Sequence, residues 1–184
     1  MGRVGESGVN LPLTDYGLFD EQSDIRVHVG VASRSLYVFK TQAARTFLSV
    51  WGHRYEQRPA YQPGVQGMTA LGWKVPWKDI PSIRKVYCPS YPLWSDFRRT
   101  ESTSDKGKKA VAVVQAMLTE GHFPLWVSAN ETIDTKMQIN GTDLIVWHKT
   151  RIQVKCDWNA GDGGEGCTGN LYIQTAERNP LRKL

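Results

Sequence analysis

The sequence predicts one domain of α/β (α+β) class, and three patterns lead to that class. Residues 25–39 alternate apolar and polar side chains, residues 104–121 carry apolar side chains at helical spacing, and residues 143–158 form two closely spaced strands. The chain has 184 residues, 40% of them hydrophobic, which suits one core. Because the sequence has no long apolar run, no secretory signal and an odd number of cysteines, we expect a soluble, cytoplasmic protein with no membrane contact.

Charge is distributed unevenly along the chain. Residues 1–25 form an acidic arm with one Lys or Arg against five Asp or Glu, whereas residues 26–100 hold twelve bases against three acids, a net charge of +9. Residues 101–184 sum to zero. A basic segment of this size favours a polyanionic partner, of which DNA is the obvious one. The alternative is that the basic side chains are scattered over a solvated surface.

The first half of the chain contains one strand segment and one helix before it becomes irregular. One face of the segment 25–39 carries Ile25, Val27, Val29 and Val31. Thr41 is placed to cap a helix over 41–57, although Gly52 weakens its interior. Residues 58–100 are rich in Pro, Gly and aromatic side chains, which predicts extended loops with short elements.

Basic and aromatic side chains alternate in that Pro-rich segment. This pairing suits nucleic acid, because the charges meet phosphates and the rings meet exposed bases. The bases predicted to contact DNA, including three lysines at the start of the next helix, are Arg58, Lys74, Lys78, Arg84, Lys85, Arg98, Arg99, Lys106, Lys108 and Lys109. The alternative is that the rings simply fill a core that lacks long helices.

The second half has a clearer order of elements. A helix over 104–121 is expected to bury one stripe and to end at Gly121. The stripe consists of Ala110, Val113, Val114, Met117 and Leu118. An apolar segment at 122–130 has strand character, and a four-residue link at 148–151 joins two strands into an antiparallel hairpin. A Gly-rich loop and a last strand at 170–176 follow.

Polar side chains gather on the predicted hairpin. Asp143 opens its first strand, and Gln153, Lys155 and Asp157 recur at every second position of the other strand, so they share one face. The opposite face presents Ile152, Val154 and Cys156, which are expected to be buried. The polar face is therefore either exposed to solvent or a functional site.

The hairpin segments GTDLIVW and RIQVKCDW, preceded by a helix, resemble the PD-(D/E)XK nuclease superfamily over about residues 101–176. The later segment TGNLYIQ also resembles one that follows the motif in some phage and bacterial members. The resemblance implies a restriction-endonuclease-like core, a mixed sheet flanked by helices, in residues 101–184. Residues 26–100 would then be a loop-rich basic part that contacts DNA. Asp143 matches the acidic residue of the motif, Gln153 stands where Asp or Glu is usual, and Lys155 matches the lysine.

The activity implied is that of a metal-dependent DNA endonuclease, a phosphodiester hydrolase. Asp143, the Gln153 side-chain oxygen and the Val154 carbonyl would bind Mg²⁺ or Mn²⁺, while Lys155 would orient or help to deprotonate the attacking water. The predicted helix lacks the Glu that many members carry, which leaves Asp157 and Asp134 as the first candidates for a further acidic ligand.

Two further expectations and one alternative accompany this reading. Cutting both strands needs two sites, so a homo-oligomer is expected. The Gly-rich loop lacks the Lys-Ser/Thr of a phosphate-binding loop, so no nucleotide cofactor is expected. The alternative function is a nucleic-acid-binding protein of the same fold that has lost its metal site.

Overall fold

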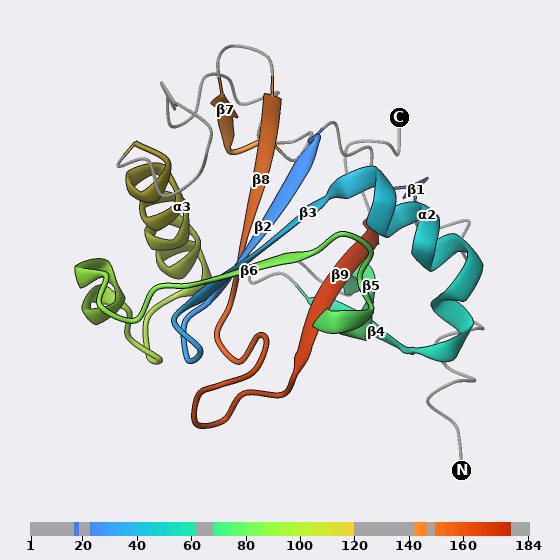
Figure 1. Ribbon diagram of the computed structural model, residues 1–184. Coiled ribbons are helices and arrows are strands. Elements are labelled where there is room, and N and C mark those ends of the chain that lie inside the picture. Colours follow the sequence, from blue (N-terminus) through green and yellow to red (C-terminus); the bar gives the residue numbers. More distant parts are fainter. Residues whose placement is uncertain (1–16, 19–22, 62–67, 120–141, 147–149, 178–184) are drawn as a thin grey trace.

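Two β-sheets and two α-helices make up the described part of the chain (Figure 1). The computed structural model describes residues 17–18, 23–61, 68–119, 142–146 and 150–177. The predicted mixed class, with α-helices and a mixed sheet, is confirmed. Within the described ranges, no helix has both the length and the apolar character that crossing a membrane requires.

The larger sheet is mixed. In spatial order its strands are β6 (Arg84–Tyr87), β3 (Ser35–Lys40), β2 (Ile25–Gly30), β8 (Thr150–Asp157) and β7 (Leu144–Val146). All neighbours are antiparallel except β2 and β8, which run parallel. The predicted strands at 25–39 and the predicted hairpin at 143–158 are confirmed as β2–β3 and β7–β8. The parallel pair brings strands of the basic segment 26–100 and of the segment 101–184 into one sheet.

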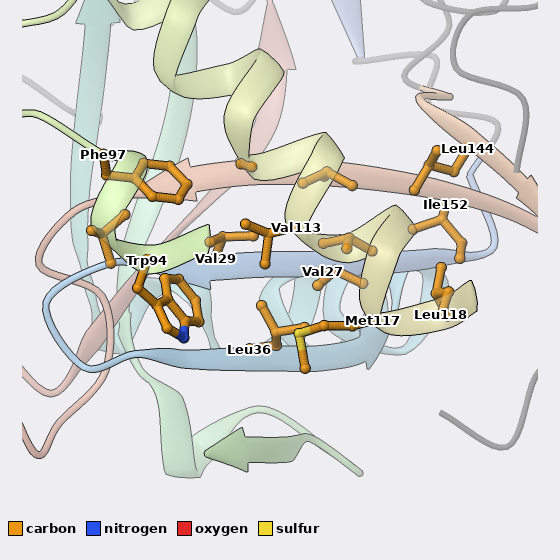
Figure 2. Close-up of a cluster of buried hydrophobic side chains, with 14 residues drawn as sticks. Val27, Val29, Leu36, Trp94, Phe97, Val113, Met117, Leu118, Leu144 and Ile152 are labelled. Carbon is orange, nitrogen blue, oxygen red and sulfur yellow. The ribbon is translucent and has the colours of Figure 1, made fainter. Parts of the chain in front are cut away.

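Helix α3 (Thr103–Thr119) covers one face of this sheet (Figures 1 and 2). The stripe predicted to be buried lies at the contact, and all five of its side chains are buried. They pack against alternate residues of β2 and β8, namely Val27, Val29, Ile152 and Val154. Burying one such side chain contributes roughly 1.5–3 kcal/mol, so this contact forms a main hydrophobic core of the protein.

The second sheet is antiparallel and covers the other face. In spatial order its strands are β1 (Gly17–Leu18), β9 (Asn170–Glu177), β5 (Met68–Pro76) and β4 (Glu56–Tyr61). Residues 58–100 were predicted to form extended loops with short elements, but they contain the nine-residue strand β5. Pro59 is tolerated in β4 because β4 is an edge strand.

The helix predicted over 41–57 ends earlier. Helix α2 (Thr41–Trp51) passes into a 3-10 turn, η2 (Gly52–Arg54), and the chain then enters β4. The cap position is Lys40, not Thr41, and it makes no side-chain capping bond. The Thr41 hydroxyl instead lies 3.0 Å from that of Ser23. The prediction was too long because the pairing of β4 with β5 overrides local helix propensity.

A second core fills the space between the two sheets. It consists of side chains from β3, α2, β5, β9 and adjoining turns: Tyr37, Phe39, Ala44, Leu48, Val75, Ile80, Ala160, Leu171 and Ile173. The predicted restriction-endonuclease-like core was a mixed sheet flanked by helices. Among the described residues, α3 covers one face and the second sheet covers the other (Figure 1).

The Gly-rich loop between β8 and β9 closes tightly on this second core. Gly161 has φ +71°, and a Cβ atom there would lie 1.7 Å from Tyr37 Oη. We expect Gly161→Ala to lower the free energy of unfolding by about 3 kcal/mol, because it adds a clash to a strained backbone. Gly169→Ala is the matched control: φ is +73° but no atom lies within 4 Å, so about 1 kcal/mol is expected. If urea denaturation shows equal losses of unfolding free energy for the two variants, the expected clash with Tyr37 is contradicted.

Candidate functional site

The β7–β8 hairpin places Asp143 beside the centre of β8. The backbone N–H of Asp143 donates to the Ile152 carbonyl at 2.8 Å. Strand β7 begins one residue later, where Leu144 pairs with Ile152. The next amide of β8 that points toward the β7 side is that of Val154. The Asp143 carboxylate accepts this N–H through Oδ2 at 2.7 Å. The acid is therefore held next to the residue that separates Gln153 from Lys155.

The polar face of β8 points toward the second sheet, not into solvent. Ile152 and Val154 lie in the core under α3, with Cys156 packed against them, so Gln153, Lys155 and Asp157 occupy the opposite face. Gln153 is only 4% exposed. The alternative prediction, that this face of the strand is exposed to solvent, is therefore wrong for Gln153.

Strand β2 adds two polar side chains to the same layer. In the parallel register Arg26 lies beside Gln153 and His28 beside Lys155. Arg26 and His28 are each 1% exposed. Neither was foreseen as a site residue, because only the parallel pairing of β2 with β8 brings them there.

Side chains of this polar layer on β2 and β8 bind backbone groups along one edge of β9. The two described residues of β1 pair with β9 at Ala176 and Glu177. Further along that edge, Arg26 Nη2 donates to the Gln174 carbonyl at 2.7 Å, and the Asp157 carboxyl accepts the backbone N–H of Tyr172. Buried backbone groups need such partners, so Arg26 and Asp157 join the two sheets.

Of the predicted acidic ligands, Asp143 alone is placed at the centre of the hairpin. Asp157 follows Gln153 by four residues, a separation of about 13 Å along a strand, and it binds the amides of Asn159 and Tyr172. Burial raises the pKa of Asp157, partly offset by these two hydrogen bonds. The structure therefore places Asp157 away from Asp143, while Asp134 lies outside the described residues.

The buried polar atoms of this layer that lack a hydrogen-bond partner among the described residues include the Gln153 side-chain oxygen and both ring nitrogens of His28. An unpartnered buried oxygen is costly in a folded protein. Gln153 Oε1 is therefore a candidate metal ligand, and the Asp143 carboxylate accepts the N–H of the next residue, Val154. In the described part of the chain, no three His, Cys, Asp or Glu side chains gather as a metal site.

The environment of His28 predicts an acid-sensitive fold. Burial, and then the charges of Arg26 and Lys155, hold the pKa of His28 well below its ordinary value of 6.5. The unfolded chain therefore binds a proton that the folded protein does not, so stability falls as pH drops below about 6.5, by up to about 1.4 kcal/mol per pH unit. Urea denaturation between pH 5 and pH 7 measures this slope.

His28→Phe should remove that contribution to the slope, because it keeps a ring against Phe39, whose centroid lies 5.3 Å away. The control is His53→Gln at an exposed position, which should leave the slope unchanged. A slope that persists unchanged in His28→Phe would contradict this origin.

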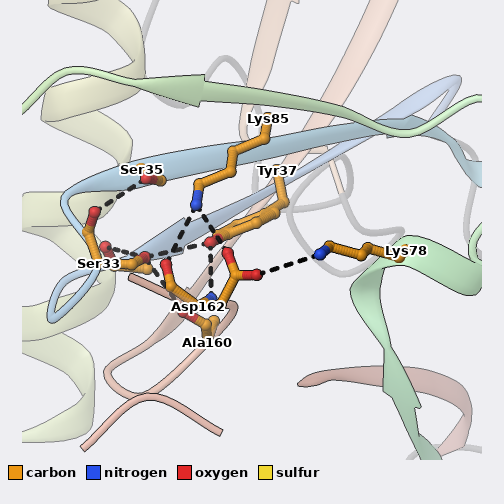
Figure 3. A network of polar contacts seen from close by, with 8 residues as sticks. Ser33, Ser35, Tyr37, Lys78, Lys85, Ala160 and Asp162 are labelled. Atoms are coloured by element: carbon orange, nitrogen blue, oxygen red, sulfur yellow. Dashed lines mark hydrogen bonds and ion pairs between the residues drawn. The ribbon is translucent and has the colours of Figure 1, made fainter. Parts of the chain in front are cut away.

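The predicted DNA contacts of the Pro-rich segment are partly engaged within the protein (Figure 3). Lys85 Nζ lies 2.7 Å from the Asp162 carboxylate, and Lys78 Nζ lies 3.7 Å from it. The Asp162 backbone N–H donates to Tyr37 Oη, which donates to Ser33. These bonds anchor the Gly-rich loop to β3 and β6. Of the other predicted contacts, Arg84 is exposed and Lys74 is half-buried, whereas the side chain of Arg58 lies outside the described ones.

The remaining predicted DNA contacts gather near the start of α3. Two of them lie against the ring of Trp158: Arg99 Cζ is 5.0 Å and Lys106 Nζ 5.3 Å from its centroid. Lys109 pairs with Glu101. Arg98, Arg99 and Lys108 are exposed. This group combines cations with an aromatic ring, Trp158, that was not among the predicted ones, and one of its lysines is neutralised by an acid.

Comparison with known proteins finds no matching family, no matching curated protein and no matching solved structure. The residues of the hairpin therefore carry the functional inference by themselves.

Proposed function

We propose that the chain is a metal-dependent DNA endonuclease with a restriction-endonuclease-like core, and that the β7–β8 hairpin is its active site. The contact between the Asp143 carboxylate and the Val154 amide, 2.7 Å, carries the proposal. It holds an acid beside a strand on which an amide and an amine flank the same residue. An acid, an amide oxygen and a lysine in this arrangement could hold a hard cation and offset charge on a phosphate, as phosphodiester cleavage needs.

Each residue has a distinct role in this proposal. Asp143, Gln153 Oε1 and the Val154 carbonyl would hold Mg²⁺ or Mn²⁺. The cation, when bound, acts as a Lewis acid on the phosphate and lowers the pKa of a water molecule. Lys155 offsets the negative charge that develops on the phosphate and orients the attacking water.

The charge of the site predicts how tightly it binds a cation. Asp143 is the one carboxylate that the described residues bring to it, whereas Arg26 and Lys155 both lower the pKa of the neighbouring His28 and so add positive potential. Cation affinity depends on the charge and number of oxygen ligands. We therefore expect weak cation binding by the free protein and tighter binding when DNA phosphates add their oxygens.

The surrounding cations supply the grip on DNA. Residues 26–100 carry a net charge of +9. Near the start of α3, Arg99 and Lys106 lie against the Trp158 ring, and Arg98 and Lys108 are exposed. Charge of this kind binds phosphates without regard to sequence. Cleavage of both strands would call for a homo-oligomer with paired sites.

A second candidate function is DNA binding without cleavage. It is favoured by the use of the polar layer as a joint between the sheets, where Arg26 and Asp157 satisfy backbone groups of β9. A protein that keeps this layer for stability alone would bind DNA and leave it intact.

One assay separates the two candidates. Supercoiled plasmid is incubated with Mg²⁺ or Mn²⁺ and either the wild-type protein or Lys155→Met. The nuclease proposal expects nicking by the wild type and a loss of at least about 10²-fold in the variant. Lys40→Met removes an exposed lysine before α2 that belongs neither to the hairpin nor to the predicted DNA contacts, so it should stay within about 3-fold of the wild-type rate. Binding without nicking by the wild-type protein would favour the second candidate, and nicking unaffected by Lys155→Met would rule out this active site.

A further inference from the structure

The proposed catalytic lysine makes a defined contact with the second sheet. Lys155 Nζ donates to the side-chain oxygen of Gln174 at 3.3 Å. Gln174 belongs to β9 and is 8% exposed. A lysine side chain is long and rotates freely about four bonds, so a buried acceptor at its end selects one orientation.

Gln174 is itself held from two sides. Its carbonyl accepts a hydrogen bond from Arg26 Nη2 at 2.7 Å, and its backbone lies opposite Gly72 of β5. A Cβ atom on Gly72 would come within 2.5 Å of the Ile173 carbonyl oxygen and 2.7 Å of Tyr172 Cζ. The close approach of β5 to β9 at this point therefore requires glycine, and it fixes the strand that carries Gln174.

We propose that Gln174 is a positioning residue for Lys155, so that the second sheet aligns the amine of the active site. The proposal rests on the function proposed above for the β7–β8 hairpin. An amide suits this task because it accepts a hydrogen bond without a negative charge. A hydrogen bond to Gln174 therefore does not neutralise the lysine, whereas a carboxylate at the same place would pair with it and weaken its charge toward DNA.

Two substitutions separate orientation from charge. Gln174→Leu keeps the size of the side chain and removes the acceptor, and Gln174→Glu keeps an acceptor and adds a charge. In single-turnover cleavage at saturating DNA, we expect each variant to lose about 10-fold or more in rate with less than about 3-fold change in apparent DNA affinity, because both act on the lysine at the chemical step. The control is Ile173→Val, a neighbour on β9 in the inter-sheet core, which should cut at the wild-type rate.

A second measurement does not depend on cutting. NMR of the Gln174 side-chain amide, assigned with Gln174→Leu and recorded without DNA or divalent ions, reports the contact itself. Lys155→Met removes the donor that lies 3.3 Å from the Gln174 oxygen and should shift these signals, whereas Lys40→Met, at an exposed position, should leave them in place.

The outcomes distinguish this inference from the proposed function. If the wild-type protein binds DNA but never cuts it, the nuclease proposal fails and the NMR measurement alone judges the contact. Unchanged Gln174 side-chain amide signals in Lys155→Met overturn the contact. A Gln174→Leu variant that cuts at the wild-type rate overturns the positioning role even if the contact is present.

Discussion

Asp143→Asn is expected to reduce DNA cleavage by at least about 10²-fold, the scale on which metal-site substitutions act, without unfolding the protein. The asparagine side-chain oxygen can still accept the Val154 N–H that the carboxylate holds at 2.7 Å. The hairpin is therefore preserved, while the negative charge that attracts the cation is lost. Single-turnover cleavage with Mg²⁺, together with thermal unfolding, measures both effects.

Asp105→Asn is the matched control for this substitution. Asp105 is an exposed acid in the first turn of α3, so neutralising it should leave cleavage within about 3-fold of the wild-type rate, since exposed charges contribute little. An Asp143→Asn protein that is folded and cuts at the wild-type rate would contradict the assignment of Asp143.

Arg26→Ala is expected to lower the free energy of unfolding by about 3 kcal/mol. The substitution leaves the Gln174 carbonyl without the donor that lies at 2.7 Å, and it opens a cavity in a layer where Arg26 is only 1% exposed. Both changes weaken the joint between the two sheets. Urea denaturation at pH 7 measures the loss.

Arg45→Ala serves as the control for the loss of an arginine. Arg45 lies half-buried on α2 and should cost no more than about 0.5 kcal/mol, as is usual for substitutions outside the core. An equal loss in Arg26→Ala and Arg45→Ala would mean that the β9 edge does not depend on Arg26.

The elements that were predicted correctly are those whose pattern is local. Helix α3 has a buried stripe at helical spacing, and the β7–β8 hairpin has a short link between alternating segments. The parallel pairing of β2 with β8 could not be predicted in this way, because it joins segments more than 120 residues apart, as Arg26 and Gln153 are. The β4–β5 hairpin was missed because its Pro and Gly resembled loop signals.

The site was predictable to the same extent. Alternation along β8 placed Gln153, Lys155 and Asp157 on one face, as observed. It did not indicate that this face meets the edge of another strand, where Asp157 binds backbone amides of Asn159 and Tyr172. The contact between Lys155 and Gln174 was equally unpredictable, since Gln174 lies in a strand of a different sheet.

The central claim is that Asp143 helps to hold a divalent cation at the β7–β8 hairpin, and Mn²⁺ binding tests it most directly. Electron paramagnetic resonance counts Mn²⁺ bound to Lys155→Met with duplex DNA, after subtraction of the ions bound by DNA alone, so that no cutting disturbs the measurement. We predict bound Mn²⁺ in Lys155→Met that is lost when Asp143→Asn is added. Equal Mn²⁺ binding by the single and the double variant would contradict the claim.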